Sequence, residues 1–483
     1  MKKDRSITKN YLYNVSYKIL TLITPLITTP YIARVLGVDN VGIYNYTYSI
    51  ISYFVLFGVL GSTIYAQREI AYVQNDKEKT NLVFWELFFI RLITVGTSIL
   101  IFSFYFPKSE YKIYLFIFLF ELIANIFDIS WLYYGIEEFK VITIRNFIIK
   151  IIGVGCIFIF VRSSTDLNIY IWCHVLILLL GNLSLWISAK KFIGKPIFKF
   201  NTVMKHFTPI LILFLPQCID SVYMIMDKIM LGKISTITQV GLYSQADKII
   251  KMAVTIVTSM GLVMSPRIAS SFATGDNKQI RRYLHSSFEF IFIIAIPIMC
   301  GLVSISDNFV GWFFGEGYEG VIILIKLLAP TVVFLGINSV IGWQYLLSVK
   351  REKDFIFSVS IGAIINIILN IILIIKFKAV GAVIASVVSM AIMSIINFIF
   401  VKKQISFKYL LSKLYKPLIA AIIMTIIVEI VGKYISVSFI STVIQVIVGI
   451  IIYILILFII KDDIMIRYVS KIKGKKNNNR DND

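Results

Sequence analysis

The sequence predicts an all-α integral membrane protein of about fourteen transmembrane helices, in two parallel-repeat bundles around a central cavity, with both termini cytoplasmic. The first observation is composition: 58% of the residues are hydrophobic and 16% are charged, whereas soluble domains are nearer half apolar and a quarter charged. The second is the length of apolar runs such as residues 207–231, 284–305 and 438–460. Runs of about 20 apolar residues match the hydrocarbon thickness of a bilayer. The third is a motif that occurs twice.

The apolar runs divide the chain into consecutive spans. We predict them at roughly residues 11–35, 41–65, 82–106, 111–134, 141–161, 168–189, 207–231, 240–264, 284–305, 320–347, 355–375, 379–400, 410–432 and 438–460. The predicted domains are an N-terminal bundle (1–195), a C-terminal bundle (196–405), two extra spans (406–461) and a basic cytoplasmic tail (462–483).

Positive charge alternates between the segments that connect the spans. The N-terminus, every second loop and the C-terminal tail hold about 32 Lys and Arg, while the other loops hold about 6. The positive-inside rule therefore places both termini in the cytoplasm and predicts a multi-pass protein of the plasma membrane. The net charge of +21 is then mostly a cytoplasmic rim that faces anionic lipids, so nucleic acid is not an expected partner.

The repeated motif is a corner between two helices. Leu36-Gly37 is followed by Val41-Gly42-Ile43-Tyr44, and Leu231-Gly232 is followed by Val240-Gly241-Leu242-Tyr243. The copies are about 195 to 199 residues apart and join spans of the same predicted orientation, as expected for two parallel repeats of a transporter. The alternative is chance similarity between two tight helical hairpins, where glycine is common. Two prolines also occur in the first span of each half: Pro25 and Pro30, then Pro209 and Pro216.

The layout of spans and the two corners, R-V-L-G…G-I-Y and D-K-I-M-L-G…V-G-L-Y-S, resemble the Wzx-type polysaccharide flippases. These belong to the multidrug/oligosaccharidyl-lipid/polysaccharide (MOP) exporter superfamily. The resemblance implies a transporter, not an enzyme, that moves an undecaprenyl-diphosphate-linked oligosaccharide repeat unit to the outer leaflet for capsule, O-antigen or cell-wall polysaccharide. It implies an anionic lipid-linked oligosaccharide and membrane lipids as partners, with a polysaccharide polymerase and glycosyltransferases as further candidates.

Charged side chains inside the spans are the candidate substrate site, because a charge kept in the bilayer usually faces a cavity or a partner. Lys248 and Lys251 are three residues apart and share one helical face near mid-membrane. We expect this pair to bind the phosphates of an anionic substrate. The cationic cavity would also draw on Lys150, Arg91, Lys18, Arg34 and Lys228. Arg145 lies within about a turn of a span end and is expected to reach water.

The acidic residues inside the spans have two possible roles, one structural and one functional. Asp220 and Asp227 are seven residues apart on one face of their span, and Asp247 and Glu121 also lie at depth. Ion pairs of Asp220 or Asp227 with Lys248 or Lys251 are the structural interpretation, and a proton or sodium site for energy coupling is the functional one. Tyrosines such as Tyr44 and Tyr48 either contact sugars or pack within the bundle.

Two other functions remain open at this point. A MATE-like drug or metabolite antiporter of the same fold would need an acid-dominated cavity, whereas cations outnumber acids within the spans. A membrane polysaccharide polymerase or ligase would need a long outer loop, and the outer loops are only about 4 to 14 residues long. The three histidines form no motif, and the four cysteines have no CxxC spacing, so we expect no metal site and no cofactor.

Overall fold

The computed structural model describes residues 7–197 and 200–462, and every regular element within these residues is a helix. The chain divides into two compact units, Met1–Gly241 and Leu242–Asp483, here called the first and the second unit. The predicted basic tail lies almost entirely outside the described residues.

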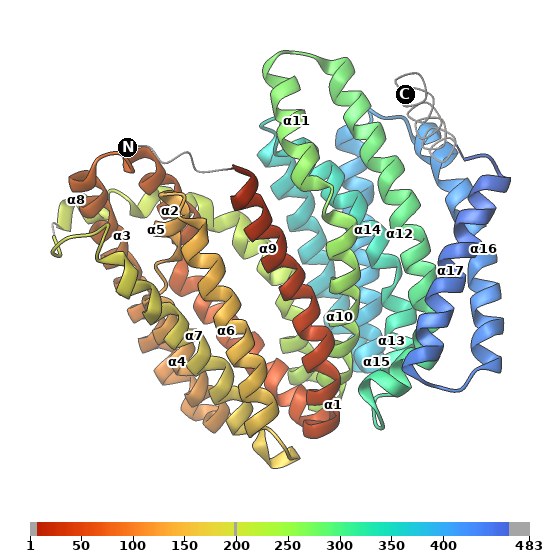
Figure 1. Ribbon diagram of the computed structural model, residues 1–483, viewed down its shortest axis with the longest axis horizontal. Helices are drawn as coiled ribbons and strands as arrows, with labels where there is room; N and C mark the ends of the chain where they lie inside the picture. The colour runs from red at the N-terminus through yellow and green to blue at the C-terminus, as the bar shows by residue number, and fades with distance from the viewer. Residues whose placement is uncertain (1–6, 198–199, 463–483) are drawn as a thin grey trace, which may run out of the picture. The chain divides into compact units, whose positions relative to one another are not determined.

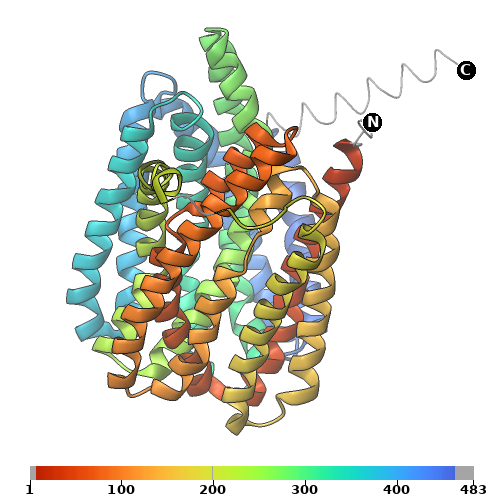
Figure 2. The same cartoon turned by 90° about the vertical axis from the view of Figure 1, so that its left-hand side faces the viewer.

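The first unit is a bundle whose long helices run side by side (Figures 1 and 2). Its helix α1 packs against α3, α4, α6 and α9, and α4 packs against α7. The elements are α1 (Ile7–Val59), α2 (Ser62–Val73), α3 (Lys77–Tyr105), η1 (Phe106–Lys108), α4 (Lys112–Ile126), α5 (Ser130–Gly135), α6 (Phe139–Phe160), η2 (Ser164–Asp166), α7 (Leu167–Ala189), α8 (Phe200–Met204) and α9 (Phe207–Ile234). Helix α9, which the repeat assigns to the second half of the sequence, therefore packs within the first unit, against α1 and α2.

The second unit is also a helical bundle, in which α12 packs against α14, α16 and α17. Helix α10 (Ile237–Thr258) begins in the first unit and continues into the second. The other elements are α11 (Gly261–Ala273), α12 (Asn277–Phe314), α13 (Gly320–Leu328), α14 (Pro330–Asn338), the π-helix η3 (Ser339–Leu346), α15 (Glu352–Val401), α16 (Phe407–Tyr434) and α17 (Phe439–Ile459).

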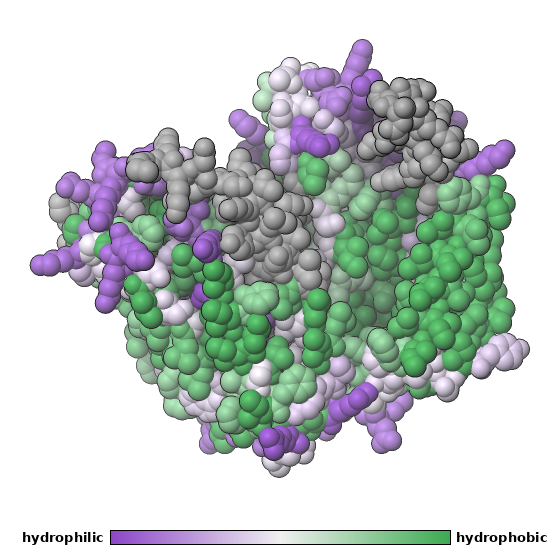
Figure 3. All heavy atoms as spheres, viewed as in Figure 1, coloured by the Kyte–Doolittle hydropathy of each residue, from purple (hydrophilic) through white to green (hydrophobic). Residues whose placement is uncertain are grey.

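The helices have the length and surface of membrane spans. Within the described residues, ten helices are long and apolar enough to cross a membrane, or eleven if the bent pair Ile237–Thr258 and Val263–Ala273 is one span. Two of the ten each cover two predicted spans. In each, two helices follow one another across a kink, at Gly37 in α1 and at Lys378 in α15. In Figure 3 each unit shows a hydrophobic middle zone between more hydrophilic ends. The protein is thus an all-α, multi-pass membrane protein, while the number of crossings and the side of the termini stay predictions.

One predicted span is interrupted. The span predicted at residues 111–134 is present as Lys112–Gly135, but within it α4 ends at Ile126 and α5 begins only at Ser130. The Oδ1 atom of Asp128 accepts a hydrogen bond from the Ser130 backbone N–H at 3.0 Å, a local turn that competes with helix continuation. The Asp128 carbonyl, which has no helical partner, accepts from Trp131 Nε1 at 3.1 Å and from Arg91.

The two copies of the repeated corner contact each other within the first unit. A Cβ atom added to Gly42 would lie 2.1 Å from the Ile237 carbonyl oxygen, and one added to Gly241 would lie 2.3 Å from the Val38 carbonyl oxygen. Positions 38 and 237 correspond in the repeat, as do 42 and 241, so the two contacts are equivalent and related by local two-fold pseudosymmetry. Glycine is required at both because only a backbone without Cβ permits this approach.

Candidate functional site

The predicted lysine pair lies on α10 in the second unit. The Lys251 Nζ atom is 2.8 Å from Asp247 Oδ2, one helical turn away, and the side chain is 39% exposed. The structure thus brings together two predicted site residues, and the acid that pairs with Lys251 is Asp247 on its own helix. Lys248 is half-buried on the same helix and has an interaction of its own.

Arg91 is enclosed within the first unit. Its side chain is 1% exposed, and its guanidinium donates to the Asp128 carbonyl at 2.5 Å and to Thr63 Oγ1 at 2.7 Å. The Asp128 carboxylate lies 3.8 Å from the same guanidinium. These contacts join α3 to α2 and to the break between α4 and α5, which gives Arg91 a structural role. A role in substrate binding stays a prediction that none of these contacts supports.

Glu121 lies in a polar cluster that the sequence did not reveal. On α4, Glu121 is 6% exposed and faces His174 of α7, with 3.9 Å between Oε2 and Nε2. The other ring nitrogen of His174 is 3.4 Å from the Tyr44 hydroxyl. Lys150, on α6, lies close enough to His174 to interact with it electrostatically. The structure therefore brings together Lys150 and Glu121, from separate predicted sets, around a histidine for which no motif gave a signal.

Some of the remaining predicted residues lie near the repeated corner, and the side chains of the others are not described by the structure. Arg34 is exposed on α1, and Lys228 is half-buried near the end of α9; both take part in interactions. Asp227 is buried and also has a partner. The side chains of Lys18 and Asp220 lie outside the described residues, so their roles stay predictions.

A second buried carboxylate fixes the segment that leads into α9. The Oε2 atom of Glu86 is 2.9 Å from His206 Nε2 and 3.5 Å from Lys205 Nζ. The Nδ1 atom of His206 is 2.8 Å from the Tyr65 hydroxyl. Since Glu86 and His206 are 0% and 4% exposed at the side chain, the network is interior and ties the start of α9 to α2 and α3. Its geometry indicates a structural clamp.

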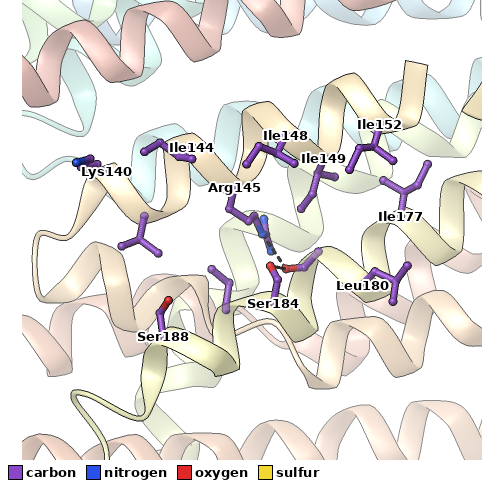
Figure 4. A pocket seen from close by; sticks show the side chains of 13 residues that line it. Lys140, Ile144, Arg145, Ile148, Ile149, Ile152, Ile177, Leu180, Ser184 and Ser188 are labelled. Atoms are coloured by element: carbon purple, nitrogen blue, oxygen red, sulfur yellow. Dashed lines mark hydrogen bonds between the residues drawn. The ribbon is translucent and has the colours of Figure 1, made fainter. Parts of the chain in front are cut away.

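An apolar groove of about 610 Å³ lies between α6 and α7 (Figure 4). Isoleucines and Leu180 form its walls, and Lys140 lies at one end. Arg145 does not reach for water as expected, because its guanidinium donates to the Gly181 carbonyl at 2.9 Å and to Asn182 Oδ1 at 2.6 Å. These acceptors lie on α7, so the Arg145 side chain joins α6 to α7.

The fold is that of a multi-pass membrane protein, and the comparisons with known proteins define its class. The family model described as "Polysaccharide biosynthesis protein" matches residues 7–272, more than half of the chain, and the chain belongs to this family. A second model, MatE, matches residues 213–372. The resemblance to a polysaccharide flippase of the MOP superfamily is confirmed at this level.

Named relatives and solved structures agree with this placement. The chain is 24% identical over 412 residues to the "Putative O-antigen transporter" of Escherichia coli (strain K12), covering 82% of this chain and 97% of that protein. It is 28% identical over 168 residues to the "Lipid II flippase MurJ" of Bacillus subtilis, covering 34% of this chain and 30% of that protein.

Among solved structures, MurJ in an inward closed conformation aligns with a TM-score of 0.72 at 18% identity, over 94% of this chain and 100% of that one. An inward-facing MATE transporter of the MOP superfamily aligns with a TM-score of 0.64 at 14% identity, over 81% of this chain and 94% of that one. At these identities the alignments concern the fold. The named relatives are transporters and flippases, not catalytic enzymes.

Proposed function

We propose that the protein is a flippase that translocates an undecaprenyl-diphosphate-linked oligosaccharide repeat unit from the inner to the outer leaflet of the cytoplasmic membrane. The observation that carries the proposal is family membership together with similarity to an O-antigen transporter along nearly its whole length. The fold shared with a lipid II flippase supports it. The product would enter capsule, O-antigen or another cell-wall polysaccharide, with a polymerase and glycosyltransferases as functional partners.

The charge of such a cargo explains the intramembrane lysines. A sugar diphosphate carries about two negative charges that cannot enter hydrocarbon unaided, and ammonium groups bind phosphate through charge-assisted hydrogen bonds. The Asp247 carboxylate, 2.8 Å from Lys251 Nζ, balances the lysine charge. We expect the phosphates to take the place of the Asp247 carboxylate on Lys251 and to contact Lys248, one turn away on α10. The prenyl chain would stay in the surrounding lipid.

Translocation then requires alternating access. In transporters built from parallel repeats, the halves rock about a substrate site near mid-membrane, and cargo biases an equilibrium that exists before binding. The proposed cationic cavity still includes Lys150, Arg34, Lys228 and Lys18. Arg91 is the weakest member because its contacts hold the first unit together.

The double substitution Lys248→Ala with Lys251→Ala tests the site. Each charge-assisted hydrogen bond contributes about 1.5–3 kcal/mol, so losing two should weaken cargo binding by roughly 100-fold or more. We expect surface polysaccharide to be lost in a strain that carries only this variant, with the protein still inserted in the membrane. Lys326→Ala is the matched control, because Lys326 also pairs with an aspartate at 2.8 Å but is not in the proposed site. Normal polysaccharide with the double variant would refute the assignment.

A MATE-like antiporter is the second candidate, because the MatE model matches residues 213–372 and the fold is shared. The two functions differ in what a deletion strain loses. A flippase deletion removes surface polysaccharide and leaves tolerance to cationic drugs unchanged, whereas an antiporter deletion has the opposite effect.

A further inference from the structure

The first unit holds a carboxylate oxygen with no hydrogen-bond partner. Within the described part of the chain, Glu121 Oε2 is buried and accepts no hydrogen bond. This oxygen lies 3.9 Å from the Nε2 atom of His174. This distance is beyond a hydrogen bond, so the two groups face each other across a gap that a small ring movement would close.

The surroundings of this pair come from four helices. From α1, Tyr44 has its hydroxyl 3.4 Å from His174 Nδ1, and the Tyr48 ring contacts the imidazole edge-on, with 5.5 Å between centroids. From α7, Tyr170 packs on Tyr44 at 4.7 Å. From α6, Lys150 is the cation that interacts with His174. From α4, the Phe118 ring lies edge-on to the imidazole, with 6.4 Å between centroids.

An ionised carboxylate in such a place is costly without compensation. A proton on Glu121 removes the charge, and a proton on His174 creates an imidazolium that balances it. Either arrangement needs one proton within the pair. Loss of that proton leaves a net negative charge on the pair, and gain of a second adds a positive charge, so the occupancy of the pair changes the local charge by one unit.

The chemistry favours a proton over a metal ion. Hard cations such as Na⁺ or Mg²⁺ are bound by several oxygen ligands, whereas here one carboxylate faces an imidazole, a lysine and aromatic rings. No group of three or more His, Cys, Asp and Glu that could hold a metal occurs among the residues described.

We propose that Glu121 and His174 form an exchangeable proton site in the first unit, whose occupancy controls the rate of cargo translocation. The His174 side chain is 34% exposed, so a proton from water can bind its Nε2 atom. When the ring approaches Glu121, the same proton passes to Oε2 and leaves a neutral imidazole. The link to translocation rests on the proposed flippase function, but the proton site itself does not.

Infrared spectroscopy of the purified protein in lipid nanodiscs tests the site directly. We expect the C=O stretching band of a protonated carboxyl group to appear and disappear with pH in the wild type and to be absent from Glu121→Gln. Glu289→Gln is the matched control, because Glu289 is also buried but is bound by Tyr409 at 3.0 Å and Lys413 at 3.4 Å. That variant should keep the titrating band. A band that is unchanged in Glu121→Gln would overturn the proposal.

A second variant covers failure of Glu121→Gln to fold. His174→Gln removes the neighbouring base, so the midpoint of the carboxyl titration should move; an unmoved midpoint would also overturn the proposal. In proteoliposomes that contain a lipid-linked sugar diphosphate, wild-type flipping should change by at least about threefold between about pH 6 and pH 8, on either side of neutral pH. This pH dependence should be lost in Glu121→Gln and kept in Glu289→Gln. If the wild type transports no such lipid, the flippase function fails and the infrared result alone decides the proton site.

Discussion

Replacing Gly42 with alanine tests the contact between the two repeated corners. The added Cβ would lie 2.1 Å from the Ile237 carbonyl oxygen, whereas a carbon and an oxygen atom normally stay at least about 3.3 Å apart. The backbones must therefore separate by about 1 Å, because neither atom belongs to a side chain that can rotate away. Overpacking of this kind costs about 1–3 kcal/mol, while alanine in a helix recovers up to about 1 kcal/mol.

The net expectation for Gly42→Ala is a loss of about 1–2 kcal/mol of stability, which lowers the thermal midpoint of a chain of 483 residues by roughly 1–2 °C. Thermal unfolding of the detergent-solubilised protein measures it. Gly241→Ala should behave alike, since its Cβ would lie 2.3 Å from the Val38 carbonyl oxygen. Gly96→Ala is the control, because no atom lies within 4 Å of its added Cβ, and it should be neutral or stabilising. Equal midpoints for Gly42→Ala and Gly96→Ala would refute the reasoning.

Two further predictions concern buried charges in the first unit. Arg91→Lys keeps the charge but cannot hold both the Asp128 carbonyl and Thr63. Breaking a buried polar network costs about 3–5 kcal/mol of stability, so we expect a lower thermal midpoint and a lower yield of folded protein. An unchanged midpoint would contradict the structural role. His206→Gln should destabilise the protein through the buried Glu86, whereas Lys205→Ala, at an exposed site, should cost less than about 1 kcal/mol. Equal effects of these two substitutions in the same assay would argue against the clamp.

The fold followed from the sequence where the physics is local. Apolar runs predict membrane helices because every backbone polar group must be satisfied within the span, and the helices of the structure lie where the runs are. The break between α4 and α5 could not be predicted in this way. The turn between Asp128 and Ser130 is local, but the Asp128 carbonyl that it frees is bound by Arg91, which is 37 positions away in sequence and becomes a neighbour only after folding.

The candidate site was partly predictable for the same reason. Asp247 and Lys251 are separated by one helical turn, so an i,i+4 rule could have found their pairing, although the sequence analysis named Asp220 or Asp227 as the partner. Glu121 and His174 lie on different helices, and a histidine without a motif carries no sequence signal for such a partner. Depth in the membrane identified Glu121 as unusual, but only the packing of α4 on α7 shows what faces it.

The mutual contact of the two corners bears on how the chain evolved. After a gene duplication, most positions of each copy are free to drift apart. Gly42 and Gly241 are different, since each backbone approaches the other copy and neither can acquire a side chain without displacing it. We infer that the two corners arose by duplication and that their contact preserved the motif in both copies.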